Sequence, residues 1–157
     1  KKQEHNTANW LILITNMHRR KKIFLNERKT RYCYVKLYAD KSAMQIAMKK
    51  ECPGIVDYKY TLGLHHAYIR LFVTKDHKTK YIPETGTIYL CKEHCGAGVA
   101  THEIMHAILW AYKHKKNKRQ YPITINTMRQ EEILLRNFTF AVRQFYTWYW
   151  KTEKQKK

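Results

Sequence analysis

The sequence has no long hydrophobic run. Its longest unbroken stretch of strongly apolar residues is the short segment 10–14, far below the roughly 20 residues that a membrane-spanning helix needs. No charged stretch followed by an apolar segment and a small-residue cleavage site opens the chain, so we predict no secretory signal. Glycine, proline and cysteine are also scarce, with 5, 3 and 4 residues in 157, whereas small disulfide-stapled secreted modules are rich in them. These absences predict a cytoplasmic protein with reduced thiols and no membrane partner.

The cysteines do not form a recognisable metal-binding pattern. Cys91 and Cys95 are four apart with His94 between them, but no second cysteine pair completes a structural zinc site. The sequence also lacks internal repeats and Gly/Ser linkers. With 44% hydrophobic residues, it predicts one domain over residues 1–157 with a single core.

Acidic residues are few: 12 Asp and Glu stand against 31 Lys and Arg, which gives a net charge of +19. A charge of this size favours contact with nucleic acid or another polyanion. The competing interpretation is a solvated, lysine-rich surface, because the excess is mainly lysine spread along the chain and no helix-turn-helix or RNA-binding signature accompanies it. The charge therefore permits nucleic acid as a partner but does not by itself predict it.

The predicted elements give an α+β fold. Residues 7–18 suit an amphipathic helix that ends in the basic cluster 18–22, and residues 31–39 alternate as a half-buried strand. Asp40 or Ser42 caps a short helix that stops before Pro53. Strands are predicted at 55–62, 65–74 and 87–91, with turns at Gly63 and at 83–86. Helices follow over about 99–114 and, after a capping box at 127–130, to about 150, before a charged tail at 151–157. The fold class expected is a small mixed β-sheet on which these last two helices pack.

The segment His102-Glu103-Ile104-Met105-His106 carries the clearest chemistry. Two histidines four apart on a helix project from the same face one turn apart. Glu103 lies beside that face, where it can take a proton from a metal-bound water. The opposing interpretation is two helical histidines bonded to backbone carbonyls, with the glutamate on a wet face.

The third zinc ligand is expected among the histidine and acidic residues that follow His106, and most of these can be excluded. Position 109 is leucine and position 112 is tyrosine, so a third histidine at the extended spacing is missing. His114 is about 12 Å further along the same helix, and Glu153 lies in the charged tail. Glu131 and Glu132 remain, at the start of the next long helix. Either carboxylate would complete a site of two histidines and one glutamate.

The stretch "GTIYLCKE...GVATHEIMHAILWA...EEILLRNFTFAVRQFY" resembles the minimal gluzincin-type metallopeptidase domains of phage and prophage proteins, which are distantly akin to SprT-like and ImmA/IrrE-type domains. The resemblance covers about residues 86–149. It implies a zincin-like fold and one Zn²⁺ held by His102, His106 and a glutamate of the next helix. The family's spacing from that glutamate to a small residue seven positions on favours Glu132, with Thr139 in the small-residue position.

Two alternatives stay open at the predicted site. Glu131 is in line with the apolar stripe of its helix and is the alternate ligand. Arg136 occupies a position where the family often has an aromatic residue, and it is either an oxyanion-stabilising cation or a surface arginine.

The function predicted is a zinc metallopeptidase that acts on a peptide or protein substrate. Glu103 is its general base, and residues 87–91 are expected to be an edge strand that receives the substrate. The rival prediction is a basic nucleic-acid-associated or protein-interaction module with a structural or vestigial metal site. The remaining histidine pair, His65 and His66, is not expected to bind a metal jointly, because strand neighbours point to opposite faces. The aromatic cluster 144–150 is expected to be core.

Overall fold

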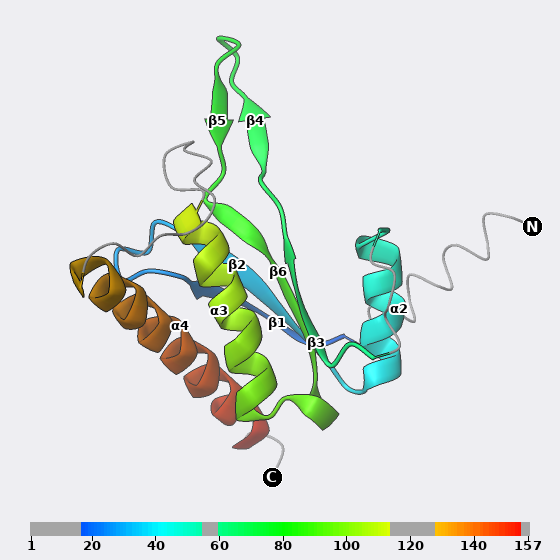
Figure 1. The fold of residues 1–157 in the computed structure, drawn as a ribbon. Helices are drawn as coiled ribbons and strands as arrows, with labels where there is room; N and C mark the ends of the chain where they lie inside the picture. The colour runs from blue at the N-terminus through cyan, green and yellow to red at the C-terminus, as the bar shows by residue number, and fades with distance from the viewer. Residues whose placement is uncertain (1–16, 55–59, 114–127, 155–157) are drawn as a thin grey trace, which may run out of the picture.

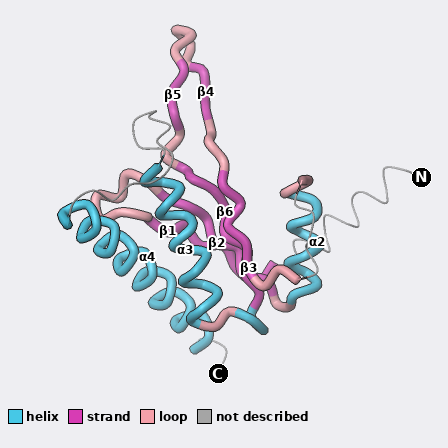
Figure 2. The backbone as a smooth tube through the Cα atoms, in the orientation of Figure 1, coloured by secondary structure: helices cyan, strands magenta, loops and turns pink. Residues whose placement is uncertain are grey.

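The computed structural model describes residues 17–54, 60–113 and 128–154. Within them the chain is α+β, as predicted (Figures 1 and 2). The elements in chain order are β1 (Met17–Phe24), β2 (Tyr32–Tyr38), α2 (Lys41–Glu51), β3 (Gly63–Ala67), β4 (Leu71–Val73), β5 (Thr79–Tyr81), β6 (Glu84–Cys91), a 3-10 turn (Lys92–His94), α3 (Ala97–Lys113) and α4 (Met128–Lys154). No helix in these residues is long and apolar enough to cross a membrane.

A mixed four-stranded sheet in the order β1-β2-β6-β3 organises the molecule. Strands β2 and β6 are parallel, and the other two pairings are antiparallel. Helices α3 and α4 pack on one face of the sheet, and α2 packs on the other (Figure 1). Strand β6 lies between β2 and β3, so the expectation that residues 87–91 form an edge strand is wrong. Among the described strands, the edge beside α3 is β3.

The main core lies between the sheet and the helices α3 and α4. The alternation in β2 sends Cys33, Val35 and Leu37 into this core, as the sequence pattern predicts. Strand β6 contributes Ile88 and Leu90 to the same layer. The other side chains of the two strands point to the opposite face, where a second, smaller cluster forms under α2. The sheet is therefore covered on both sides, but α2 covers only part of its face.

Helix α2 begins where its capping signal predicts. The Asp40 carboxylate accepts a hydrogen bond from the backbone N–H of Ala43 at 2.8 Å, so Asp40 rather than Ser42 is the N-cap. Two buried methionines, Met44 and Met48, hold the helix against the sheet. The prediction of a short helix capped at this position and ending before Pro53 is confirmed.

The expected N-terminal helix is wrong in the part that the structure describes. Residues 7–16 lie outside the described residues, but Met17–Phe24 is strand β1, so the basic cluster 18–22 is in the sheet. Of residues 19–24, the part of β1 whose side chains the structure describes, only Ile23 is buried. A strand with so few buried positions has almost no hydrophobic periodicity for sequence reasoning to detect.

Three other boundaries differ from the expectations. The predicted turn at 83–86 is the start of β6, in which Gly86 adopts a φ of +144° that favours glycine. The predicted strand 65–74 is divided into β3 and β4, which pairs with β5 as a projecting hairpin (Figure 1). Of the predicted strand 55–62, residues 55–59 lie outside the described residues and 60–62 are not in a strand.

Helix α4 extends to Lys154, so most of the expected charged tail is helical. The last turn is anchored by Thr152, which is buried and accepts a hydrogen bond from Arg19, and by an ion pair between Lys92 and Glu153. Further back on α4, Phe145 is fully buried and its ring packs against Tyr146, Trp148 and Tyr149. The prediction that the aromatic cluster 144–150 belongs to the core is confirmed, apart from the exposed Trp150.

Candidate functional site

Helix α3 positions the predicted reaction centre. Small and apolar residues at helical spacing bury one side of it: Ala100, Ile104, Ala107, Ile108 and Ala111. His102 and His106 lie beside this buried stripe and are exposed, whereas Glu103 is only 8% exposed. The helix therefore fixes the relative positions of the three side chains through its own packing.

The two imidazoles of α3 converge. The Nε2 atoms of His102 and His106 are 2.9 Å apart, and the ring centroids are 4.5 Å apart in an edge-to-face arrangement. The structure gives this contact as a hydrogen bond between the two rings. Within the described residues neither Nε2 is bonded to a backbone carbonyl, the partner that the opposing interpretation of the motif expects. Two nitrogen atoms this close can ligate one ion at the usual zinc–nitrogen distance of about 2.0–2.1 Å.

Strand β3 approaches α3 closely because residue 63 is a glycine. A Cβ at this position would lie 2.7 Å from Cγ1 of Val99 and 3.2 Å from Cγ of Glu103. The first distance is shorter than real Cβ contacts, so a side chain here would require Val99 to shift, and glycine allows the close approach without this. As a result the backbone of β3 reaches the Glu103 carboxylate, which accepts a hydrogen bond from the His65 N–H at 2.7 Å.

Two opposing effects act on the pKa of Glu103. Burial raises the pKa of Glu103, and the His65 N–H and the nearby imidazoles of His106 and His102 act in the opposite direction by stabilising the carboxylate. The hydrogen bond also satisfies an N–H on the edge of the sheet, where no neighbouring strand of the described residues accepts it. The carboxylate therefore has a structural contact besides any chemical role.

His65 belongs to the same site, which sequence reasoning missed. Its side chain points towards α3, and His66 points to the other face beside Tyr68, so the two histidines are separated as predicted. Burial, with a further contribution from nearby His106, lowers the pKa of His65 to about 4, so the imidazole is neutral near pH 7. Its Nε2 is buried and has no hydrogen-bond partner in the described part of the chain. The alternation of Gly63, His65 and Ala67 is the one sequence signal for this placement.

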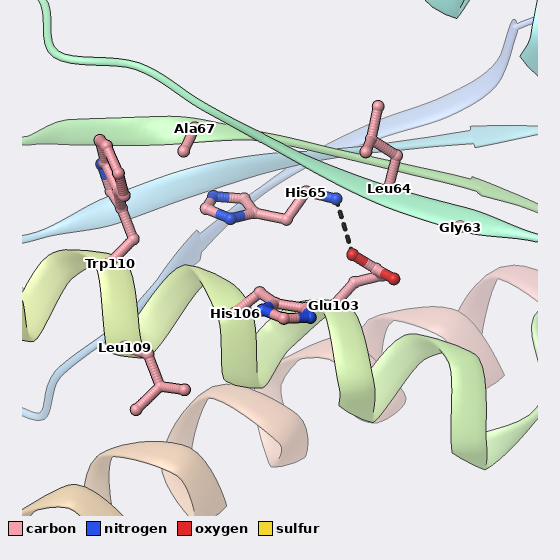
Figure 3. A pocket seen from close by; sticks show the side chains of 8 residues that line it. All are labelled: Gly63, Leu64, His65, Ala67, Glu103, His106, Leu109 and Trp110. Carbon is pink, nitrogen blue, oxygen red and sulfur yellow. Dashed lines mark hydrogen bonds between the residues drawn. The ribbon is translucent and has the colours of Figure 1, made fainter. Parts of the chain in front are cut away.

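These residues surround a cleft of about 460 Å³ between β3 and α3. Figure 3 shows Glu103 and His106 rising from the helix towards His65, with Trp110 at the far end. The lining is Gly63, Leu64, His65, Ala67, Glu103, His106, Leu109 and Trp110. A carboxylate and two imidazoles thus meet at the floor and wall of an open, largely apolar cleft.

The glutamates predicted as third ligands are elsewhere. Glu132 lines a different hollow of about 340 Å³ on α4, together with Glu27, Arg136 and Arg143. Glu131 is also exposed. In residues 17–54, 60–113 and 128–154, no group of three or more His, Cys, Asp or Glu side chains could hold a metal ion. Neither glutamate is therefore brought together with His102 and His106, and the third ligand stays a prediction.

Arg136 lies in the same second hollow as Glu132. Its guanidinium forms an ion pair with Glu27, the Nη2–Oε2 distance being 2.6 Å, and 59% of its side chain is exposed. It is not among the residues that line the cleft at Glu103 and His106. This position matches the surface-arginine alternative, and the oxyanion role remains a prediction.

The four cysteines are free and buried. Burial raises the pKa of Cys33 to about 12 and that of Cys95 to about 12. Burial also raises the pKa of Cys52 and Cys91. Since the thiolate is the reactive form, these side chains behave as small core residues.

Comparison of the chain with family models, curated proteins and solved structures gives no match.

Proposed function

We propose that this protein is a zinc-dependent peptidase with a zincin-like fold, whose reaction centre is formed by Glu103 and His106, which line the cleft between α3 and β3, and by His102, which lies beside His106 on α3. One observation carries the proposal: the two Nε2 atoms converge at 2.9 Å, and one of the two rings, His106, lines the cleft in which the adjacent Glu103 carboxylate is buried.

The donor set fits zinc in two positions. Imidazole nitrogens are among the commonest zinc ligands, and a catalytic site has three protein ligands and one open position. No described side chain is grouped with both histidines as a third ligand, so three candidates remain to be tested. Glu132 and its alternate Glu131 are predicted from the sequence, and His65 is a neutral imidazole that lines the cleft. We propose His102 and His106 as two of the zinc ligands. The third ligand is to be identified from the metal content of single variants.

The residues of the chain have distinct tasks in the reaction. A bound Zn²⁺ would supply a water of lowered pKa and polarise the scissile carbonyl. Glu103 receives the proton of that water and passes it to the leaving amine. The His65 N–H holds one Glu103 oxygen at 2.7 Å, which leaves the other oxygen free for this transfer.

The substrate class follows from strand β3. Among the described strands it has no partner on its outer side, and it lines the cleft directly beside Glu103. An extended peptide can add to such an edge through the backbone groups of β3 other than the His65 N–H, which is already bonded to Glu103, with its side chains directed alternately to either face. Strand β3 therefore takes the substrate-receiving role that was expected of residues 87–91.

Cleavage of an unbiased peptide mixture, read by mass spectrometry, tests the proposal. The purified protein should generate new peptide ends, and a zinc chelator and Glu103→Gln should each abolish them. Cleavage that persists at the wild-type level in Glu103→Gln would exclude the proposed base.

A further inference from the structure

A second surface lies on the sheet face opposite the cleft. Alternation in β1 and β2 directs Arg20, Lys22, Phe24, Tyr32 and Tyr34 to this face, and we call this set the aromatic–basic face. Helix α2 packs at the other end of the same face, over Tyr38 and Tyr89. The two cations are exposed and the three rings are half-buried.

The rings hold the cations flat against the sheet. The Arg20 guanidinium lies 3.7 Å from the centroid of the Tyr34 ring. Lys22 Nζ lies 3.8 Å from the Tyr32 centroid and 5.1 Å from the Phe24 centroid. Cation–π contacts of this kind restrict two otherwise mobile side chains. Their charge is thereby displayed in a fixed arrangement on this face.

The surroundings of this face carry a strong excess of positive charge. Residues 17–31 contain seven Lys and Arg against a single acidic residue, Glu27, which is already paired with Arg136. Glu84, the carboxylate next to Tyr32, is buried and bonded to Arg70 and Tyr68. The acidic groups close to this face are thus neutralised by their own partners, and an approaching anion meets mainly Arg and Lys.

We propose that the aromatic–basic face binds single-stranded nucleic acid. Proteins that bind single strands combine a positive surface that follows the phosphates with aromatic rings or guanidinium planes on which bases stack. The outer side of the Arg20 guanidinium is the stacking plane, with Tyr34 supporting it from beneath. Lys22 and the cations of the β1–β2 turn contact the phosphates.

A single strand fits this face better than a duplex does. Reading duplex DNA requires a helix or ribbon that enters a groove, and the face is a sheet surface whose cations lie against it. The face is formed by the neighbouring β-strands β1 and β2, whose length suits the extended path of a single nucleic-acid strand. The surface is also separate from the peptidase cleft, which lies on the other side of the sheet at β3.

Fluorescence anisotropy with a labelled single-stranded DNA of about 15 nucleotides, its RNA counterpart and the matching duplex tests this proposal. Binding should weaken with salt between about 50 mM and 200 mM, and the slope of log K against log salt should become shallower by about 0.7 in Arg20→Gln/Lys22→Gln, since Lys22 is the phosphate contact that this variant loses and each such contact on a single strand contributes about 0.7. Tyr34→Leu should weaken binding about tenfold, and Tyr34→Phe, which keeps the ring, should bind like the wild type.

The matched control is Lys75→Gln/Lys80→Gln, which removes the same charge from exposed residues of the β4–β5 hairpin. It should retain binding, and so should Glu103→Gln. Preference for the DNA or the RNA strand identifies the natural ligand. Equal loss of affinity in the two double variants, wild-type affinity in Tyr34→Leu, or duplex binding as tight as single-strand binding would each overturn the proposal. The two double variants change only exposed side chains, so they decide the question even if Tyr34→Leu does not fold.

Discussion

Glu103 combines two roles that a single substitution can separate. Its carboxylate accepts the hydrogen bond of the His65 N–H and lies beside the converging imidazoles of α3. Glutamine has the same shape and keeps an oxygen that can accept from this N–H, but it cannot take up the proton of a water. Alanine removes both capacities.

We therefore expect Glu103→Gln to fold as stably as the wild type, whereas Glu103→Ala loses about 1–2 kcal/mol of unfolding free energy, because the N–H of the edge strand then has no protein acceptor. Urea denaturation measures both variants, and peptide cleavage should be absent in both. Equal stability of the two variants would show that the hydrogen bond from His65 contributes nothing to the fold.

The thiols give a second prediction for single residues. All four are buried and their pKa values are raised by burial, so a thiol reagent should modify the native protein very slowly at neutral pH. In denaturant the same reagent should count all 4 cysteines of the sequence. Rapid modification of the native protein would contradict the burial described above, and fewer than the full number in denaturant would indicate a disulfide.

At the scale of elements, the contact between β3 and α3 is what builds the cleft. Gly63 is the residue that allows it, since a side chain there would strike Val99 and Glu103. Local patterns could not reveal this contact, because it joins segments about 40 residues apart and depends on the antiparallel register of β3 with β6. The same limit explains why His65 was not predicted as a site residue.

Gly63→Ala should accordingly move β3 away from α3. We expect a loss of about 1–3 kcal/mol in unfolding free energy from overpacking, together with loss of peptide cleavage. Gly54→Ala is the matched control, because a Cβ at Gly54 has no neighbour within 4 Å, and its stability should change little. If Gly63→Ala were as stable and active as this control, the close approach would not be a requirement of the site.

The elements that local signals specify were predicted well. The alternation of β2, the Asp40 cap of α2 and the helix that carries His102 and His106 all follow from short-range patterns. The face of α4 did not follow from its sequence. Its buried residues include Leu134 and Ala141, and Glu132 precedes Leu134 by two positions, which turns it about 200° away from the buried stripe.

At the scale of the whole molecule, the sheet separates two surfaces with different chemistry. One side carries the cleft lined by His106 and the buried Glu103 carboxylate, with His102 beside it, and the other carries cations held on aromatic rings. The net charge of +19 alone did not distinguish a solvated surface from a binding surface. What distinguishes the two is where the basic residues lie in the fold. Much of the charge is on β1, and the sheet face that its side chains occupy became clear only from the pairing of β1 with β2.

The two surfaces should therefore respond independently. Glu103→Gln should abolish peptide cleavage without changing the affinity for a single-stranded oligonucleotide, and Arg20→Gln/Lys22→Gln should do the reverse. Anisotropy and peptide mass spectrometry on the same preparations measure both properties. Loss of both functions in either variant would mean that the two surfaces are coupled.

Whether His102 and His106 bind a metal ion can be decided by elemental analysis of protein purified without added zinc. We expect zinc at close to one equivalent in the wild type and in Glu103→Gln, and its loss in His102→Ala/His106→Ala. Single substitutions of Glu131, Glu132 and His65, measured alongside, identify the third ligand by which of them loses the metal. Wild-type protein with no more zinc than the double-histidine variant, even after incubation with zinc and removal of the excess, would contradict the account.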